Sequence, residues 1–297
     1  MKFLNTPASR FVNLPDYPFS ANYLEIEGGM KMHYIDEGSN EKGLVLCLHG
    51  EPSWSYLYRK MIPIFVKAGY RVIAPDLIGF GKSSKPTSTS DYTYQKHVNW
   101  TKNLISKLEL SDINLFCQDW GGLIGLRILG EEPHLFSRVV AGNTFLPTGE
   151  YTPSEAFLKW QKFSQTTPVL PVGKIIQNST VTKMSDQEVA AYEAPYPDES
   201  YKAGARIFPS LVPTSTDDPE SANNKKAWET LVKLEKPFLT LFSDSDPITK
   251  GVETVLQKMI PGCKGQPHTI IKGGGHFLQE DKGEEIAGLV VKFMETT

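Results

Sequence analysis

The chain has 297 residues, a length that suits two domains or one large domain with an insertion. Hydrophobic residues make up 40% and charged residues 22%, as in an ordinary globular protein. The net charge of −3, without long runs of lysine or arginine, argues against nucleic acid as a partner. No segment approaches the ~20 apolar residues of a membrane span and the first residues lack a signal-peptide pattern, so we expect a cytoplasmic protein with no membrane contact.

The predicted elements begin with a β-hairpin and continue as repeated strand–helix units. Residues 22–27 and 30–36 flank Gly28-Gly29 and predict an antiparallel hairpin at a sheet edge. Short apolar runs then predict strands, and longer amphipathic patterns predict helices between them. The predicted strands are 45–48, 71–75, 113–117, 138–141, 238–242 and 268–271; the predicted helices are 54–67, 94–108, 122–131 and 283–294. This alternation predicts an α/β fold with a mostly parallel, doubly wound sheet.

The alternation stops between about residue 143 and residue 213. This segment is rich in Pro, Tyr, Thr and Ser and contains only short helical patterns. It carries too many aromatic residues for a disordered linker. We therefore predict a core domain formed by residues 1–143 and 214–297, with residues 144–213 inserted between core strands as a helical cap.

Reactive residue types follow four of the predicted strands. His49-Gly50-Glu51-Pro52 follows the first, Gln118-Asp119-Trp120-Gly121 the third, Asp244-Ser245-Asp246-Pro247 the fifth, and Gly275-His276 the sixth. Ligands of open α/β sheets bind beyond the carboxyl ends of the strands, so these residues are expected to meet there. The order of nucleophile, acid and histidine is that of the α/β-hydrolase fold, in which a serine occupies the turn that Asp119 occupies here.

An aspartate in this turn changes the chemistry that is possible. A carboxylate that displaces a leaving group from saturated carbon becomes an ester, which water can hydrolyse, whereas a serine would become a stable ether. Asp119 is thus the expected nucleophile, and His276 the base that activates the hydrolytic water. Asp246 is the preferred acid behind His276, with Asp244 as the second choice. The backbone N–H groups of Glu51 and Trp120 are placed to stabilise the oxyanion.

Two other functions fit part of this pattern. An epoxide hydrolase also uses an aspartate nucleophile, but needs a proton donor for the leaving alkoxide, which the tyrosines of the cap segment could supply. A binding protein that has lost catalysis would leave the retained His276 and Asp246 unexplained. Asp119 alone could be a helix N-cap, and His49 is expected to shape its loop rather than act as a second base.

These motifs resemble the haloalkane dehalogenases, in the subfamily whose nucleophile turn reads Q-D-W-G and whose oxyanion loop reads H-G-E-P. The similarity includes Leu48–Pro63, Gly79-Phe80-Gly81-Lys82-Ser83 and Gly274–Glu280, and covers nearly the whole chain. The resemblance implies an α/β-hydrolase fold with a cap. It also implies hydrolysis of a small halogenated alkane by water, giving a primary alcohol, a halide ion and a proton.

The resemblance assigns roles to individual residues. Asp119 is implied as nucleophile, His276 as base and Asp246 as acid, and Glu51 helps to hold the hydrolytic water. The indole N–H groups of Trp120 and Trp160 are implied as halide donors, although Trp160 could instead only pack in the cap. The substrate cavity is implied to be lined by Phe157, Phe208, Pro209 and Val212. No cofactor is implied, no histidine has metal-ligand spacing, and a monomer is expected.

Overall fold

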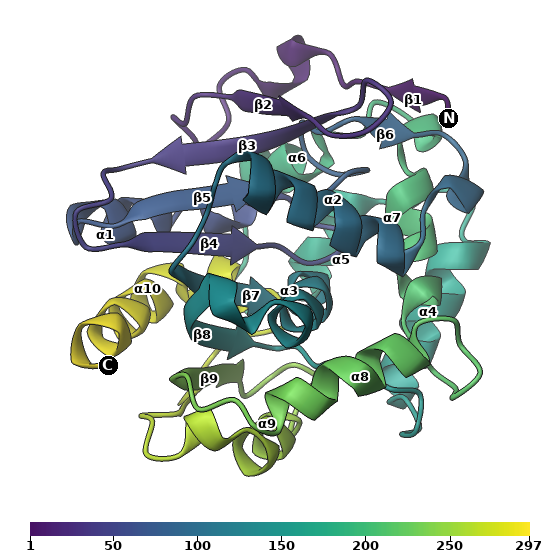
Figure 1. Cartoon of the computed structure of the whole chain (residues 1–297). Coiled ribbons are helices and arrows are strands. Elements are labelled where there is room, and N and C mark those ends of the chain that lie inside the picture. Colours follow the sequence, from purple (N-terminus) through teal and green to yellow (C-terminus); the bar gives the residue numbers. More distant parts are fainter.

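An eight-stranded sheet organises the fold in this computed structural model, which describes residues 1–297 (Figure 1). Its order is β10-β9-β8-β7-β4-β5-β3-β2. The β2–β3 and β3–β5 pairs are antiparallel and every other pair is parallel. The strands are β2 (Asn22–Glu25), β3 (Lys31–Glu37), β4 (Leu44–Leu48), β5 (Arg71–Pro75), β7 (Ile113–Gln118), β8 (Phe136–Gly142), β9 (Phe238–Ser243) and β10 (Thr269–Ile271). The predicted mostly parallel, doubly wound sheet with an antiparallel edge hairpin is confirmed.

Helices pack in two groups around this sheet. α2 (Tyr94–Lys107) and α8 (Ser221–Leu231) pack on α3 (Trp120–Glu131), whereas α1 (Ile62–Lys67) packs on α10 (Leu278–Thr296) (Figure 1). All residues of β4, β7 and β9 are buried, as expected for strands covered on both faces. The edge strand β2 instead alternates between partly buried and exposed residues. Helix α9 (Glu253–Met259) follows β9, and β1 (Phe3–Leu4) pairs with β6 (Lys85–Pro86) in a separate small sheet.

A run of short helices lies between β8 and β9. Before α8, it comprises α4 (Glu155–Thr166), α5 (Val172–Asn178), α6 (Asp186–Glu193), η5 (Glu199–Tyr201), α7 (Ala203–Ile207) and η6 (Phe208–Leu211). Ser154 caps α4 by accepting from the Phe157 N–H, and Ser185 with Glu188 forms a capping box on α6. These polar caps explain how a segment rich in Ser, Thr and Pro begins several helices. The division into a core and a cap at residues 144 and 213 remains our proposal.

A buried ionic cluster ties α6 to the rest of the molecule. The Arg59 guanidinium donates to Glu280 Oε2 in α10 at 2.6 Å and to Glu188 Oε1 in α6 at 2.9 Å. The Tyr192 hydroxyl, also in α6, donates to Glu280 at 2.5 Å. Glu280 and the Arg59 side chain are almost inaccessible to solvent, so both depend on this pairing.

Several elements differ from the predicted pattern. The helix expected at 54–67 is instead the 3-10 turn η2 (Ser55–Tyr58) followed by α1, and α10 begins five residues earlier than predicted, with a kink at Lys282. Helices α8 and α9 were not predicted. The remaining 3-10 turns are η1 (Ala8–Phe11), η3 (Thr89–Asp91), η4 (Pro133–Leu135) and η7 (Pro261–Cys263). None of the helices is both long and apolar enough to span a bilayer.

Candidate active site

The site is built around the sharp turn that joins β7 to α3. Asp119 occupies this turn with φ 48° and ψ −126°, a conformation that few non-glycine residues adopt. Its carbonyl oxygen accepts hydrogen bonds from the Gly122 N–H at 2.8 Å and the Thr144 hydroxyl at 2.7 Å. A Cβ at Gly122 would lie 1.9 Å from Thr144 Oγ1, so only glycine fits there. This packing fixes the carboxylate at the carboxyl edge of the sheet.

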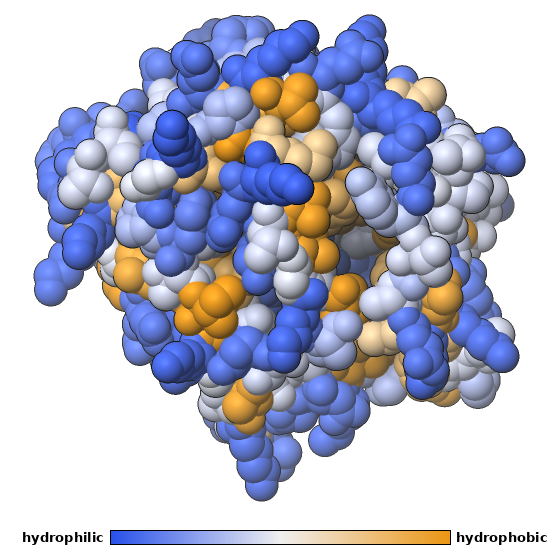
Figure 2. Space-filling view, turned by 90° about the horizontal axis from the view of Figure 1, so that it is seen from below, coloured by the Kyte–Doolittle hydropathy of each residue, from blue (hydrophilic) through white to orange (hydrophobic).

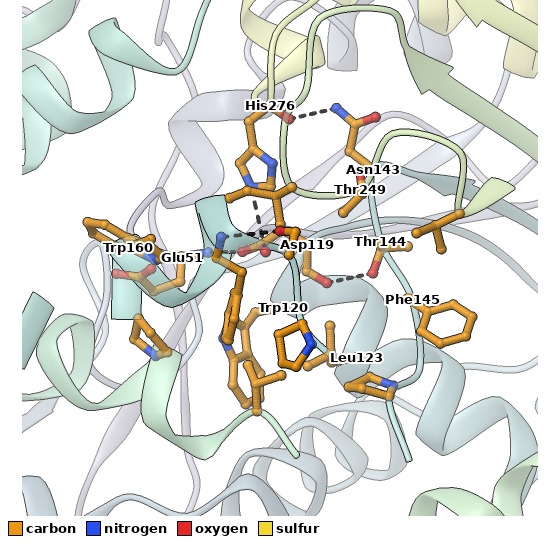
Figure 3. A pocket seen from close by; sticks show the side chains of 18 of the residues that line it. Glu51, Asp119, Trp120, Leu123, Asn143, Thr144, Phe145, Trp160, Thr249 and His276 are labelled. Atoms are coloured by element: carbon orange, nitrogen blue, oxygen red, sulfur yellow. Dashed lines mark hydrogen bonds and ion pairs between the residues drawn. The ribbon is translucent and has the colours of Figure 1, made fainter. Parts of the chain in front are cut away.

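His276 lies between two carboxylates. Its Nδ1 is 3.1 Å from Asp246 Oδ2. Its Nε2 is 3.6 Å from Asp119 Oδ1 (Figure 3). Burial alone would lower the pKa of His276, but Asp246 and Asp119 more than offset burial and raise the pKa above its ordinary value. Burial opposes ionisation of Asp246 too, yet His276 and nearby hydrogen bonds lower its pKa to about 2. The arrangement holds an imidazole that can take a proton beside Asp119.

The two aspartates after β9 point to different partners. Asp246 accepts from the Ile248 N–H at 2.9 Å and from the Thr249 hydroxyl, and is almost fully buried. Asp244 instead accepts from the Ser245 hydroxyl at 2.9 Å and the Gly273 N–H at 3.0 Å. Of the two acids considered from the sequence, only Asp246 contacts His276.

The loop after β4 supplies a donor to the nucleophile position. The Glu51 N–H donates to Asp119 Oδ2 at 2.7 Å, whereas the Trp120 N–H makes no hydrogen bond to this carboxylate. His49 uses both ring nitrogens elsewhere: Nδ1 is 2.9 Å from the Gly50 carbonyl oxygen, and Nε2 accepts from the Leu77 N–H at 2.9 Å. The His49 ring therefore shapes the loop, as expected, and is not free to act as a base.

A cavity of about 460 Å³ adjoins these residues. Its wall includes Glu51, Asp119, Trp120, His276 and Trp160 (Figure 3). The segment between β8 and β9, which supplies Trp160, also contributes Phe157, Pro209 and Val212. Figure 2 shows that the lower face of the molecule is hollowed and that apolar side chains gather around the hollow. An apolar chamber with a few polar groups at one end suits a small apolar substrate.

Phe208 does not line this cavity, which corrects the expectation from the sequence. Its ring is fully buried and packs against Trp120 at 4.5 Å and Phe80 at 4.7 Å between ring centroids. Phe208 and Pro209 are adjacent in the 3-10 turn η6, and adjacent residues of such a turn point in different directions. Pro209 faces the cavity, and Phe208 supports the Trp120 indole from behind.

Asn143 is a site residue that the sequence reasoning missed. It follows β8, and its side-chain amide donates to the carbonyl oxygens of Gly275 and His276 at 2.9 and 3.0 Å. Its own carbonyl oxygen accepts from the Ser243 N–H at 2.9 Å. Asn143 thereby joins the ends of β8 and β9 to the loop that carries His276. Its position two residues after the predicted strand 138–141 was the available signal.

Comparison with known proteins places this geometry in a family. Residues 43–283 match the family model of the alpha/beta hydrolase fold. The chain is 59% identical to a haloalkane dehalogenase of Psychrobacter cryohalolentis, over 99% of this chain and 98% of that protein. The chain belongs to the haloalkane dehalogenases. A haloalkane dehalogenase of Mycolicibacterium paratuberculosis is 50% identical over 99% of both chains.

A solved haloalkane dehalogenase structure supports the same placement. The enzyme from Paraglaciecola agarilytica superposes with a TM-score of 0.91 at 37% identity, and the match covers 97% of both chains. That structure is described as tetrameric, which differs from the monomer expected from the sequence. The α/β-hydrolase fold and the family predicted from the sequence are both confirmed.

Proposed function

We propose that the protein hydrolyses small haloalkanes through a covalent ester on Asp119. The observation that carries this proposal is the line of side chains Asp119, His276 and Asp246 at one end of an apolar cavity, with 3.6 Å and 3.1 Å between the carboxylate oxygens and the imidazole nitrogens. Membership of the haloalkane dehalogenases supports the same reaction.

In the first step, an Asp119 carboxylate oxygen attacks the carbon that bears the halogen. A carbon–oxygen bond forms, the carbon–halogen bond breaks, and the halide leaves with the bonding electron pair. The Glu51 N–H holds Asp119 Oδ2, so that Oδ1 faces His276 and the cavity. The immobile carboxylate lowers the entropic barrier to attack on a substrate confined in the chamber.

In the second step, water attacks the ester carbonyl carbon of Asp119. His276 Nε2 accepts the proton of this water, and Asp246 stabilises the imidazolium that forms. The Glu51 N–H, already bonded to Oδ2, stabilises the oxyanion. Collapse of this intermediate releases the alcohol and regenerates the Asp119 carboxylate, and His276 gives its extra proton to solvent.

Two features of the cavity favour halide over epoxide as the leaving group. Trp120 and Trp160 line the same cavity, and their indole N–H groups can donate hydrogen bonds to an anion that is no longer hydrated. Of the cap-segment tyrosines 151, 192, 196 and 201, only Tyr151 lines the cavity. Tyr192 bonds Glu280 instead, so no buried tyrosine pair faces Asp119 as a proton donor.

A substrate comparison tests the proposed reaction. The purified protein is incubated with 1-bromobutane, 1,2-dibromoethane or styrene oxide, and bromide, acid and diol are measured. We expect bromide and acid in equal amounts from the bromoalkanes, above a control without protein. Hydrolysis of styrene oxide without any bromide release would instead establish an epoxide hydrolase.

We propose water and one small haloalkane as the only partners that the reaction needs, with no metal or cofactor. For assembly, the monomer remains our proposal, although a related enzyme is tetrameric. Light scattering coupled to size exclusion measures this directly. A mass near 33.1 kDa is expected, and four times that mass would show that this chain assembles as that relative does.

A further inference from the structure

The carboxyl group of Glu51 is a buried acid in the wall of the catalytic cavity. The residue is 4% exposed, its Oε1 has no hydrogen-bond partner, and it forms no ion pair. Its backbone N–H is committed to Asp119, which brings the two acidic residues together. A buried carboxylate with no cation beside it and one oxygen without a donor is costly, so the charge state of this group needs an explanation.

The titratable groups around Glu51 come from three other elements. Asp119 lies in the turn between β7 and α3, His276 follows β10, and the buried Tyr196 phenol follows α6. Burial and the Asp119 charge raise the pKa of Glu51 well above its ordinary value. His276 and a hydrogen bond from Trp160 act in the opposite direction but do not reverse the shift. An ionised Glu51 would place a second negative charge beside Asp119.

We propose that Glu51 is protonated in the resting enzyme and that its O–H group donates a hydrogen bond to the departing halide, alongside Trp120 and Trp160. The three side chains line one cavity next to Asp119 (Figure 3). The proton stays on Glu51 throughout alkylation, so no further reactant is needed. This inference rests on the proposed dehalogenation and assigns one more catalytic donor to it.

Charge conservation in the site explains why a neutral acid is useful. Alkylation neutralises Asp119 and creates a halide ion, so the cavity carries one negative charge before and after the step. An ionised Glu51 would raise this to two charges in an apolar chamber and would compete with the halide for the Trp160 N–H. A protonated Glu51 removes the repulsion and adds a donor. After the halide has left the cavity, the carboxyl group of Glu51 can hydrogen-bond the hydrolytic water.

Infrared difference spectroscopy tests the protonation state without any turnover. At neutral pH, the carbonyl stretch of a protonated carboxylic acid is expected in the wild type and absent in Glu51→Gln. Asp244→Asn is the matched control, because Asp244 is held by donors outside the cavity and should leave the band unchanged. Bromide should shift the band. The proposal is wrong if Glu51→Gln removes no such band, or if saturating bromide leaves it unmoved.

Two uncharged variants test the donor role. Gln keeps a hydrogen-bond donor at position 51 and Leu does not, although their sizes are similar. Glu51→Gln should keep bromide affinity close to that of the wild type, whereas Glu51→Leu should lose roughly tenfold or more, the effect of one hydrogen bond to a charged group. Equal losses in both variants would contradict a neutral donor. Bromide binding does not require turnover, so failure of dehalogenation and failure of this inference are separate results.

Discussion

Three carboxyl groups surround His276, and their neighbours give each a different behaviour. Asp246 receives hydrogen bonds from Thr249 and Ile248 and faces the imidazole, which keeps it ionised down to low pH. Glu51 is buried with one oxygen unpartnered and only the Trp160 indole as a donor, and burial raises its pKa. Asp119 lies between them with one amide donor and an open path to the cavity. The surroundings of each carboxyl group, and not its residue type, therefore decide its role: Asp119 is the nucleophile, Asp246 orients His276, and Glu51 is the neutral donor.

Replacing His276 should separate the two chemical steps. In His276→Phe, Asp119 is still able to attack substrate, but no base activates water, so the ester should accumulate. Intact-protein mass spectrometry after exposure to 1-bromobutane should show one added butyl group, while steady-state turnover falls by about two to four orders of magnitude. The same treatment of the double variant with Asp119→Ala should add no mass. An unmodified His276→Phe protein would argue against the covalent route.

Replacing Trp160 should weaken halide binding. Trp160→Phe keeps an aromatic ring in the cavity wall but removes its N–H donor, so bromide affinity should fall by roughly 10- to 100-fold. Quenching of intrinsic fluorescence by bromide measures this affinity. Trp100→Phe is the matched control, because the Trp100 N–H donates to Glu27 and lies outside the cavity. If both variants bind bromide equally well, Trp160 only packs in the cap.

Residue-level prediction from the sequence succeeded where a strand end decides the position. Asp119 and Asp246 follow the buried strands β7 and β9, and His276 follows the short edge strand β10. The parallel sheet brings all three to one edge. Phe208 could not be oriented in this way, because the direction of a side chain in a short 3-10 turn depends on tertiary packing. Asn143 was missed because its role is to hold the backbone of two other segments, at Ser243 and at Gly275-His276, and its position after a strand does not indicate such contacts.

At the scale of elements, the turn between β7 and α3 depends on the first glycines of α3. Gly122→Ala should disrupt it, since the added methyl would overlap Thr144 and overpacking costs about 1–3 kcal/mol. Gly288→Ala in α10 is the matched control: nothing lies within 4 Å of a Cβ there, and the change should stabilise by about 0.4–1 kcal/mol. Urea unfolding measures both changes. Equal stability of the two variants would show that the turn tolerates a side chain.

The predicted elements were most accurate for the buried strands. The expected strand at 71–75 coincides with β5, and the one at 113–117 is one residue shorter than β7, because continuous apolar runs are distinct when both faces are covered. Helix α8 was missed, since only part of one face of Ser221–Leu231 is apolar. The order of the strands in the sheet could not be predicted from the sequence either, because it depends on long-range pairing that no local pattern encodes.

At the scale of the whole molecule, buried carboxylates make stability depend on pH. The pKa values of Asp246 and Glu280 are lowered to about 2, in each case because ionic partners overcome the effect of burial. The unfolded chain would bind protons at these groups near pH 4, whereas the folded chain binds them only near pH 2. Both groups therefore stabilise the fold above about pH 4, and their contribution is lost as the pH falls towards 2.

Urea unfolding between pH 6 and pH 2 measures this loss. The unfolding midpoint should fall most steeply below about pH 4, and Asp246→Asn should reduce the slope. Asp217→Asn, at an exposed position, should leave the slope unchanged. A wild-type midpoint that stays constant down to pH 2 would contradict the assignment.

The ionic cluster of Arg59, Glu188 and Glu280 ties α6 to α10. Helix α4 buries only Ser164 and is bonded instead to the neighbouring α7 and η6, through Arg206 and the Pro209 carbonyl oxygen. Yet α4 supplies Phe157 and Trp160 to the cavity. Substitutions on α4 can therefore reshape the chamber while the firmly held half of the segment and the catalytic residues stay in place. Natural divergence in substrate range, and laboratory evolution towards new haloalkanes, should concentrate on α4 and spare α6.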